Sequence, residues 1–482
     1  MPAIITDQIR VLNASNFVSG IGNANNSFYV FIGLPNATEV ATDWNTSTPD
    51  PVDNFDQHDN IYDTLISAKK INSTDVLRVI KKIAWTSGTI YEMYRHDYSV
   101  SNLTPQTSAS NLYNANYYVM NSDFRVYECI YNGAAPSNSG NGIVSLDEPV
   151  HTDLEPRLES DGYLWKYLYT IKPSDIVKFD SAEYIPVPSD WATSTDVENV
   201  RNNAVDGKIE TVVIEDIANA TYQFAGTKNN VPVRGDGTGA LASVTFIDGK
   251  PSSVQVTNGG SGYSFATLDL DDVVTGSGAR FSVIIPPPGG HGSDIYRELG
   301  ANKVLIYSRI ENSDVTNPDF PTGNQFARIG VVKDPQVWDS TTIFTGSSGS
   351  GVYGIRLLGA AASSMAVAVD GDITQTVSAG TTAIGKIIGY DQVTKTLQYW
   401  QDRSLATIGA GSSVPRYGYT LNKFTSTPGV GGSKNVVITT TTGNETLEIE
   451  TGFTGVSTTV NSRTYYFGQS YTNGLANPEI KK

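Results

Sequence analysis

The chain has 482 residues with 33 Lys or Arg and 49 Asp or Glu, which gives a formal net charge of −16. A surface this acidic repels a phosphate backbone, so we expect no nucleic-acid binding. The wholly apolar runs are far shorter than the roughly 20 residues of a membrane-spanning helix, so we expect no membrane insertion. A single cysteine, Cys129, excludes a disulfide within one chain and fits a reducing compartment, as does an N-terminus without the pattern of a secretory signal.

The composition favours a β-rich fold. Charged residues make up only 17%, whereas Gly (45 residues), Thr, Ser and Asn are abundant, and Gly and Asn supply the positive-φ positions that hairpins require. The 26 Tyr, 16 Phe and 6 Trp can bury enough area to argue against disorder. We predict a mainly β, multi-domain chain of about three domains, with a β-sandwich core, few short helices and small inserted β-domains.

The first 207 residues are predicted to begin the core β-domain. A strand is expected at 26–35, where Pro35 stops it, and a helix is expected at 53–70. Asp53 or Asn54 can cap this helix, which has an apolar stripe and two lysines at its carboxyl end. Further strands are predicted at 76–84, 115–120 and 124–131.

The most informative segment is 160–191, SDGYLWKYLYTIKPSDIVKFDSAEYIPVPSDW. It reads as a strand, a one-turn break at Pro-Ser-Asp and a second strand. Leu164, Tyr167 and Tyr169 cannot all share a face with Trp165, so both faces of the first strand are expected to be covered.

The sequence pattern changes at residue 208. Strands are expected at 209–217, 241–247, 253–257 and 266–270, separated by glycine-rich turns. We predict that 208–299 is an inserted Gly/Tyr-rich β-module. The run Pro286–Gly290 would act as a stiff linker that returns the chain to the core domain.

Residues 300–340 are predicted to continue the core domain, with strands at 302–311 and 325–334. A second inserted β-domain is expected over 341–470, followed by a C-terminal segment at 471–482. Within the second insertion, residues 381–400 read as a hairpin with a turn at 391–394. The other strands predicted there are 365–369, 434–440 and 445–450.

We find no pattern of metal-ligating or catalytic histidines. His58, His96, His151 and His291 each stand in a polar or loop-like context, and none has the spacing of a metal motif. We therefore expect surface or loop histidines and no metal site.

Three short motifs imitate functional ones. Gly380–Lys386 is similar to a phosphate-binding loop, but Ile387 takes the place of the magnesium-binding Ser/Thr and a strand follows instead of a helix, so we expect no nucleotide site. Cys129, on a Tyr-rich strand, is expected to be a small core residue. Arg234-Gly235-Asp236 is expected to form a turn.

Asp269, Asp271 and Asp272 are candidate ligands of a calcium ion. The Asp-x-Asp alternation puts two carboxylates on one face, but the glycine and the distal glutamate of a calcium loop are absent. Charge that protects a strand edge against aggregation is the preferred interpretation.

Paired carboxylates of a glycosidase are the strongest enzymatic alternative, with Asp175, Asp180 and Glu183 as candidates. The sequence gives no distance between them. We prefer an interpretation in which the surrounding aromatic residues are core or interface anchors, namely Tyr163, Trp165, Tyr167 and Tyr184. We therefore predict no catalytic, cofactor-binding or metal-binding residues, no cofactor and no enzymatic activity.

The segment 160–191 resembles the baseplate wedge protein encoded by gene eight of T-even-type contractile-tailed bacteriophages. The same order recurs: Asp-Gly-Tyr, a Trp two places on, a Tyr-Leu pair, a Pro-containing break and a Glu-Tyr-Ile-x-Val-Pro close. Four more pieces are similar to the family and follow in the same order: 26–33, 79–85, 124–130 and 323–335.

The resemblance implies a structural virion protein of a myophage-like tail, assembled in the host cytoplasm. It implies a homodimer within each baseplate wedge that contacts other wedge subunits and transmits a rearrangement when the tail contracts. Two stretches, 208–300 and 340–470, have no clear counterpart in the short family members. The chain also stops at 477–482, where the family continues into one more strand.

Two alternatives remain open. The first is a carbohydrate-binding or carbohydrate-cleaving tail protein that uses the Gly/Tyr module as a sugar platform. The second is an inert β-sandwich scaffold outside any virus.

Overall fold

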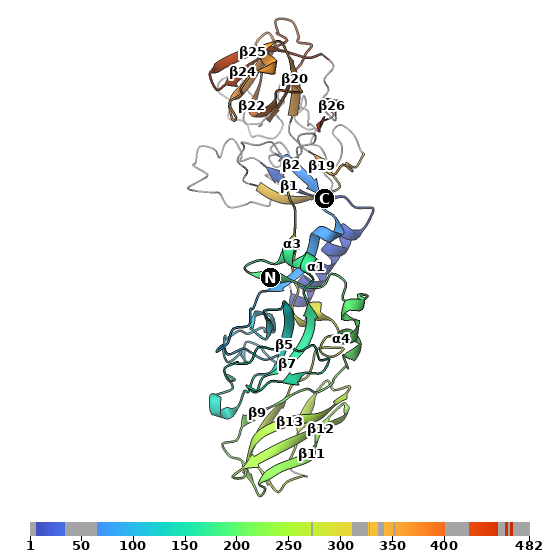
Figure 1. Ribbon diagram of the computed structural model, residues 1–482, viewed down its shortest axis with the longest axis vertical. Coiled ribbons are helices and arrows are strands. Elements are labelled where there is room, and N and C mark those ends of the chain that lie inside the picture. The colour runs from blue at the N-terminus through green and yellow to red at the C-terminus, as the bar shows by residue number, and fades with distance from the viewer. Residues whose placement is uncertain are drawn as a thin grey trace. The chain divides into compact units, whose positions relative to one another are not determined.

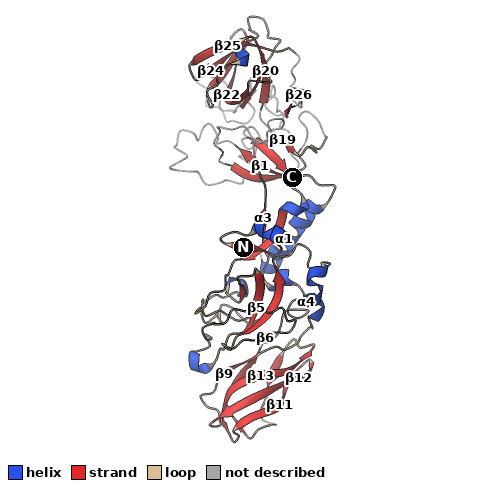
Figure 2. Cartoon of the chain, viewed as in Figure 1, coloured by secondary structure: helices blue, strands red, loops and turns tan. Residues whose placement is uncertain are grey.

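The computed structural model describes residues 6–33, 65–270, 273–310, 326, 328–335, 342–349, 353–400, 424–451, 458–460 and 463–465. Strands account for 41% and helices for 13%, so the predicted mainly β fold with several sheets and few short helices is confirmed (Figure 2). The chain divides into two compact units. Unit 1 comprises residues 1–19 and 76–307, and unit 2 comprises residues 20–75 and 308–482.

The core of unit 1 contains two antiparallel sheets (Figure 1). One has the order β4-β5-β7-β6, with bounds Tyr118–Met120, Arg125–Tyr131, Leu164–Thr170 and Arg157–Leu158. The other has the order β17-β3-β8, with bounds Lys303–Ile306, Val76–Lys81 and Tyr184–Pro186. Neighbouring residues Trp165 and Lys166 of β7 point to opposite faces of their sheet and both are buried. The prediction that both faces of β7 are covered is therefore confirmed.

The 208–299 region of unit 1 builds a second group of sheets with its own apolar cluster. The largest sheet has the order β13-β12-β11-β14, with bounds Lys250–Ser261, Thr238–Ile247, Gly226–Gly235 and Ala266–Leu268. Two strand pairs complete it: β9 (Val212–Asp216) with β16 (Arg280–Val283), and β10 (Thr221–Tyr222) with β15 (Gly276–Ser277). The turn between β12 and β13 has positive φ at both Asp248 and Gly249, as a tight hairpin requires.

Unit 2 contains a sheet and a closed barrel. The sheet has the order β18-β1-β2-β19, with bounds Arg328–Lys333, Phe28–Gly33, Leu65–Lys70 and Ser348–Gly349. The barrel has the order β20-β23-β22-β21-β24-β25, and pairing of β20 with β25 closes it. In that order, the bounds of its strands are Tyr353–Leu358, Thr396–Trp400, Thr381–Asp391, Asp372–Ser378, Asn435–Thr440 and Gly443–Ile449. A further hairpin joins β26 (Thr458–Val460) to β27 (Arg463–Tyr465).

The helices are few. The described α-helices are α1 (Asp7–Gly22), α3 (Pro173–Phe179), α4 (Glu198–Asn203) and α5 (Ile295–Glu298). Short 3-10 turns occur at Ser73–Asp75, Leu112–Asn114, Pro136–Asn138, Thr195–Val197 and Ala361–Ser363. Among the described residues, none of these helices combines the length and apolarity that crossing a membrane would need.

Three local predictions were wrong. The expected helix at 53–70 ends in a strand, because residues 65–70 form β2 between β1 and β19; its residues 53–64 lie outside the described part. The expected strand at 365–369 is mostly irregular, with a single bridge from Val367 to Thr440. The break after β7 is the seven-residue helix α3, which Pro173 begins, and not a single turn.

Candidate functional site

A cluster of charged side chains is buried in unit 1 where the 208–299 region leaves the core and returns to it. Glu128 comes from the middle of β5, whereas His291 follows the Pro286–Gly290 run and Glu298 ends α5. All three side chains are buried. Asp294 caps α5 by accepting hydrogen bonds from the backbone N–H groups of Tyr296 and Arg297, and this fixes the turn that carries Glu298.

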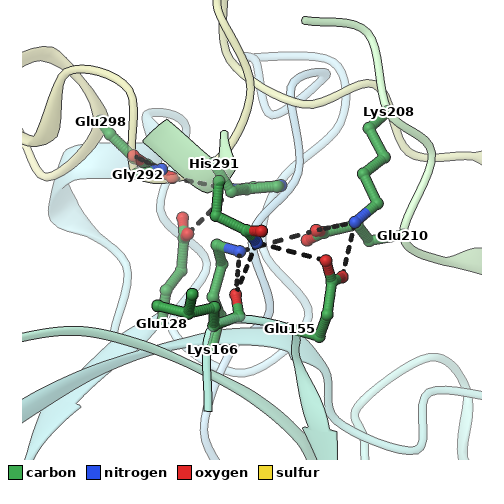
Figure 3. Close-up of polar contacts among 10 residues, drawn as sticks. Glu128, Glu155, Lys166, Lys208, Glu210, His291, Gly292 and Glu298 are labelled. Atoms are coloured by element: carbon green, nitrogen blue, oxygen red, sulfur yellow. Dashed lines mark hydrogen bonds and ion pairs between the residues drawn. The ribbon is translucent and has the colours of Figure 1, made fainter. Parts of the chain in front are cut away.

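Both glutamates meet the same imidazole nitrogen (Figure 3). Nδ1 of His291 lies 2.8 Å from Oε2 of Glu128 and 2.8 Å from Oε1 of Glu298. The backbone N–H of Gly292 donates to Oε2 of Glu298 at 2.8 Å. Gly290 lets the linker approach this closely, because a Cβ there would lie 2.3 Å from the carbonyl oxygen of Val205, and its φ is +88°.

The pKa values within the cluster move in opposite directions. Burial raises the pKa of Glu128 well above its usual range, and the charge of Glu298 adds to that effect. Burial alone would lower the pKa of His291, but the charge of Glu128 and hydrogen bonds to both glutamates outweigh it and raise the pKa to about 10. Burial likewise opposes ionisation of Glu298, but the hydrogen bond between Glu298 and His291 outweighs this effect and lowers the pKa of Glu298. At neutral pH the imidazole is therefore protonated and paired with Glu298.

Two aromatic residues enclose the histidine and the turn beneath it. The ring of Tyr94 meets the imidazole edge-on, with centroids 4.7 Å apart. The hydroxyl of Tyr117 donates to the backbone carbonyl of Glu298 at 2.6 Å. These contacts hold the cluster inside the main apolar core of unit 1, which includes Tyr94, Tyr117 and Cys129.

The charged network continues to the other end of the inserted region. Lys166 is the cross-strand partner of Glu128, and its Nζ lies 3.7 Å from Oε1 of Glu210. Lys208 reaches the same oxygen at 3.9 Å and Oε2 of Glu155 at 2.5 Å. The network therefore anchors residues at both ends of the 208–299 region to the core sheet (Figure 3).

Two buried acceptors in the network lack partners. Oε1 of Glu128 and Oε2 of Glu210 have no hydrogen-bond partner within the described part of the chain. A buried acceptor left without a bond costs about 1–3 kcal/mol. Each such atom in a folded protein therefore calls for an explanation, for example an ion or a water molecule.

Two surface cavities lie elsewhere in unit 1. One, of about 710 Å³, is lined by residues that include Arg95 and Glu215, which form an ion pair with each other. The other, of about 760 Å³, is lined by residues that include Lys81, Glu183 and Lys303. Glu128, His291 and Glu298 line neither cavity, so the cluster is not placed to act on a substrate held in either of them.

The three candidate glycosidase carboxylates have different surroundings. Glu183 lines the second cavity. Asp180 is bound by Lys82 at 2.7 and 3.0 Å, and Asp175 lies in the first turn of α3. Neither Asp175 nor Asp180 lines that cavity.

Of the four aromatic residues expected to be core or interface anchors, two are core residues. Tyr163 and Trp165 are buried and stack with their ring centroids 5.3 Å apart. Tyr167 and Tyr184 are half-buried. Cys129 is buried beside them on β5, where burial raises the pKa of its thiol well above the usual range.

The expectation of surface histidines was wrong for two of the four. His151 and His291 are buried, against the rings of Tyr127 and Tyr94 respectively. His96 is exposed in a turn, as expected, and His58 lies outside the described residues. Sequence reasoning missed the cluster, although Glu128 and Lys166 are each the one charged residue in the interior of an aromatic-rich strand.

The motifs that imitate functional sites lie in strands, or in the bends next to them. Thr381–Lys386 lies in strand β22, as the expectation of a strand required. The turn expected at Arg234-Gly235-Asp236 was wrong for its first two residues, which end strand β11. Asp236 lies in the bend between β11 and β12, where its carboxylate accepts hydrogen bonds from Ser264 and Phe265. Asp269 follows β14, and Asp271 and Asp272 are outside the described residues.

Comparison with known proteins gives no assignment. No family model matches the chain, and no curated protein matches it.

Proposed function

We propose that this chain is a structural subunit of a phage tail baseplate wedge, which holds neighbouring subunits in register and transmits a rearrangement when the tail contracts. The observation that carries the proposal is the place of segment 160–191. It contributes β7, α3 and β8 to unit 1, and its residues Tyr163 and Trp165 are fully buried there. The residues that carry the resemblance to the wedge family thus belong to the core strands and buried side chains of unit 1.

The buried charges also favour an architectural role. The His291 cluster, enclosed by Tyr94 and Tyr117, holds the end of the 208–299 region, and the ion pair of Lys166 with Glu210 holds its start. These contacts tie segments that are far apart in the sequence to one sheet. A unit held together in this way suits a subunit that passes force to its neighbours.

An acidic and apolar segment of unit 1, residues 144–159, is the surface that we propose for subunit contact. It exposes five large apolar side chains: Val144, Leu146, Val150, Leu154 and Leu158. Five such side chains within one short segment make it a candidate for the apolar surface that marks interaction sites. The same segment has five acidic residues against one arginine, so like charges disfavour pairing with a copy of itself. We therefore assign it to another wedge subunit with a basic, apolar surface.

The proposed homodimer within each wedge rests on the family resemblance alone, so the oligomeric state needs a separate measurement. Light scattering on the purified full-length chain gives it directly. A dimer at micromolar concentration supports this part of the proposal, and a strict monomer removes it.

The carbohydrate alternative receives less support from the Gly/Tyr module. Its Tyr222, Phe246 and Tyr263 are buried, and the hydroxyl of Tyr263 donates to the carbonyl of Val233. Buried rings cannot stack on a sugar. Phe265 is exposed by 63%, so glycan-array binding that disappears in Phe265→Ala would favour the alternative.

Quantitative mass spectrometry of purified tailed particles from a phage that encodes the chain tests the proposal. The family resemblance implies a six-fold baseplate, so a structural wedge subunit should be present at a fixed copy number that is a multiple of six. Absence from intact particles, or a few copies that vary between preparations, would contradict it.

A further inference from the structure

We propose that Glu128, His291 and Glu298 form a binding site for one divalent transition-metal ion. Each residue offers one ligand atom, and these atoms all lie within 4.8 Å of one another in the buried core of unit 1. One imidazole nitrogen with carboxylate oxygens is a donor set that Zn²⁺ takes in proteins. The inference is independent of the proposed role in a tail.

The positions of the donors suit coordination after a small opening of the cluster. Nδ1 of His291 is 2.8 Å from each carboxylate oxygen, which is a hydrogen-bond separation. Ligands about 2.0–2.1 Å from a tetrahedral Zn²⁺ are about 3.3 Å from each other, so each separation must grow by about 0.5 Å. Side-chain rotation of the two glutamates is enough for a change of this size.

The surroundings already contain a supporting contact and a spare ligand atom. Oε2 of Glu298 is held by the backbone N–H of Gly292 at 2.8 Å, as outer hydrogen bonds orient metal-ligating carboxylates. Oε1 of Glu128 is buried and has no hydrogen-bond partner among the described residues. It is therefore available to coordinate the ion as a second oxygen of the same carboxylate.

The donors of the cluster can balance the charge of a divalent cation. Two carboxylates face one imidazole nitrogen. Any proton on the donor atoms passes to solvent when M²⁺ binds, because a ligating imidazole nitrogen and a ligating carboxylate must be deprotonated. The ion then lies between a neutral imidazole and two carboxylates, and no oxidation state changes.

The bound ion would link two parts of the chain that are far apart in the sequence. Glu128 and His291 are 163 residues apart in the chain, and strands β9 to β16 of the β-module all lie between them. With one cysteine the chain has no internal disulfide for this purpose. A metal bound to the folded state stabilises it by mass action.

Calorimetric titration of the full-length, chelator-treated chain with ZnCl₂ tests the proposal. We expect one Zn²⁺ per chain and a higher melting temperature in the bound state. Glu298→Gln and His291→Gln should weaken binding by at least about 100-fold, since loss of outer partners alone costs 10–100-fold. Glu92→Gln is the matched control, because Glu92 is an equally buried carboxylate whose partners are the N–H groups of Gln106 and Thr107; its affinity should stay within about 3-fold of the parent.

A second measurement covers the case in which the cluster variants fail to fold. X-ray absorption of the Zn²⁺-loaded parent chain should show a first shell of nitrogen and oxygen with scattering from a single imidazole. Failure of the parent chain to bind one Zn²⁺, binding that the cluster variants retain, or a shell without imidazole would each overturn the proposal.

Discussion

Glu128 and His291 meet at 2.8 Å although 163 residues separate them along the chain. Glu128 stands on β5 directly opposite Lys166 of β7, and Lys166 in turn reaches Glu210 at the start of the inserted region. The neighbouring strands β5 and β7 therefore contact both ends of the module. Glu128 of β5 contacts its end, and Lys166 of β7 contacts its beginning. This relationship explains why two charges occupy the middle of apolar strands.

Removal of the histidine should destabilise unit 1 strongly. His291→Ala leaves Glu128 and Glu298 buried together without the cation between them, and breaking a buried ion pair in this way costs about 3–5 kcal/mol. Urea unfolding in the presence of a chelator measures the free energy without a metal contribution. Val100→Ala, at a side chain exposed by 85%, should change it by less than about 0.5 kcal/mol. Equal losses in the two variants would show that the cluster does not hold the fold.

Trp165 should be the most costly aromatic residue to truncate. It is fully buried, stacks on Tyr163 and meets Tyr91 edge-on with centroids 5.8 Å apart. Trp165→Ala should lower the free energy of unfolding by about 3–5 kcal/mol. The half-buried Tyr167→Ala serves as the comparison and should cost clearly less. An unchanged melting temperature for Trp165→Ala would mean that the core is assigned wrongly.

The β-module should be removable only if the charged residues that bind its two ends to the core stay in the chain. Asp216 and Arg280 are paired residues of β9 and β16, so an Asn-Gly turn can replace residues 217–279. This shortened chain should be soluble and keep the near-ultraviolet circular dichroism of the unit 1 core. Deletion of 209–299 removes Glu210, His291 and Glu298 together and should give aggregated product. Soluble, folded protein from the longer deletion would contradict the anchoring role of the cluster.

The carboxyl group of Asp236 should titrate unusually low. Hydrogen bonds from the side chain and backbone of Ser264 and from the backbone of Phe265 lower its pKa to about 2. Because the folded pKa lies below the unfolded value of about 3.9, this contact stabilises the module above that value, and its contribution is lost as the pH falls through about 2. A carbon-detected NMR titration measures the pKa, and Ser264→Ala should raise it toward the ordinary value. An ordinary pKa in the parent chain would rule out the hydrogen-bonded turn.

Charge introduced into segment 144–159 should block assembly without unfolding the chain. Leu146 and Leu158 are exposed by 57% and 60%, so Leu146→Asp and Leu158→Asp remove apolar contact area and add repulsion at a proposed interface. The variants should keep the parent melting temperature and fail to enter tail particles in a complementation assay. Val430→Asp changes an exposed residue of unit 2 and is the control. Normal incorporation of both leucine variants would exclude this surface.

The elements that sequence predicts well are those with a local signal. The strands around Asp248-Gly249 follow from apolar alternation on either side of a tight turn, and β7 follows from its run of aromatic residues. Helix α1 was missed because its sequence, with Gly20 and Gly22 at its end, has a weak apolar stripe. Residues 65–70 became a strand because pairing with β1 and β19 outweighs the helical pattern.

The site could not be predicted because its contacts are non-local. Nothing in the sequence around His291 states that Glu128 is its partner. The available signal was a lone glutamate and a lone lysine in two apolar strands, which indicates buried partners. It does not identify them, since strand register and the path of the returning linker decide which groups meet.

Electron cryo-microscopy of the contractile tail of a phage that encodes this chain tests the central claim most directly. The account predicts density in each baseplate wedge into which unit 1 fits, with segment 144–159 against a neighbouring subunit. A baseplate map in which every wedge density is explained by other proteins, with this chain absent, would contradict it.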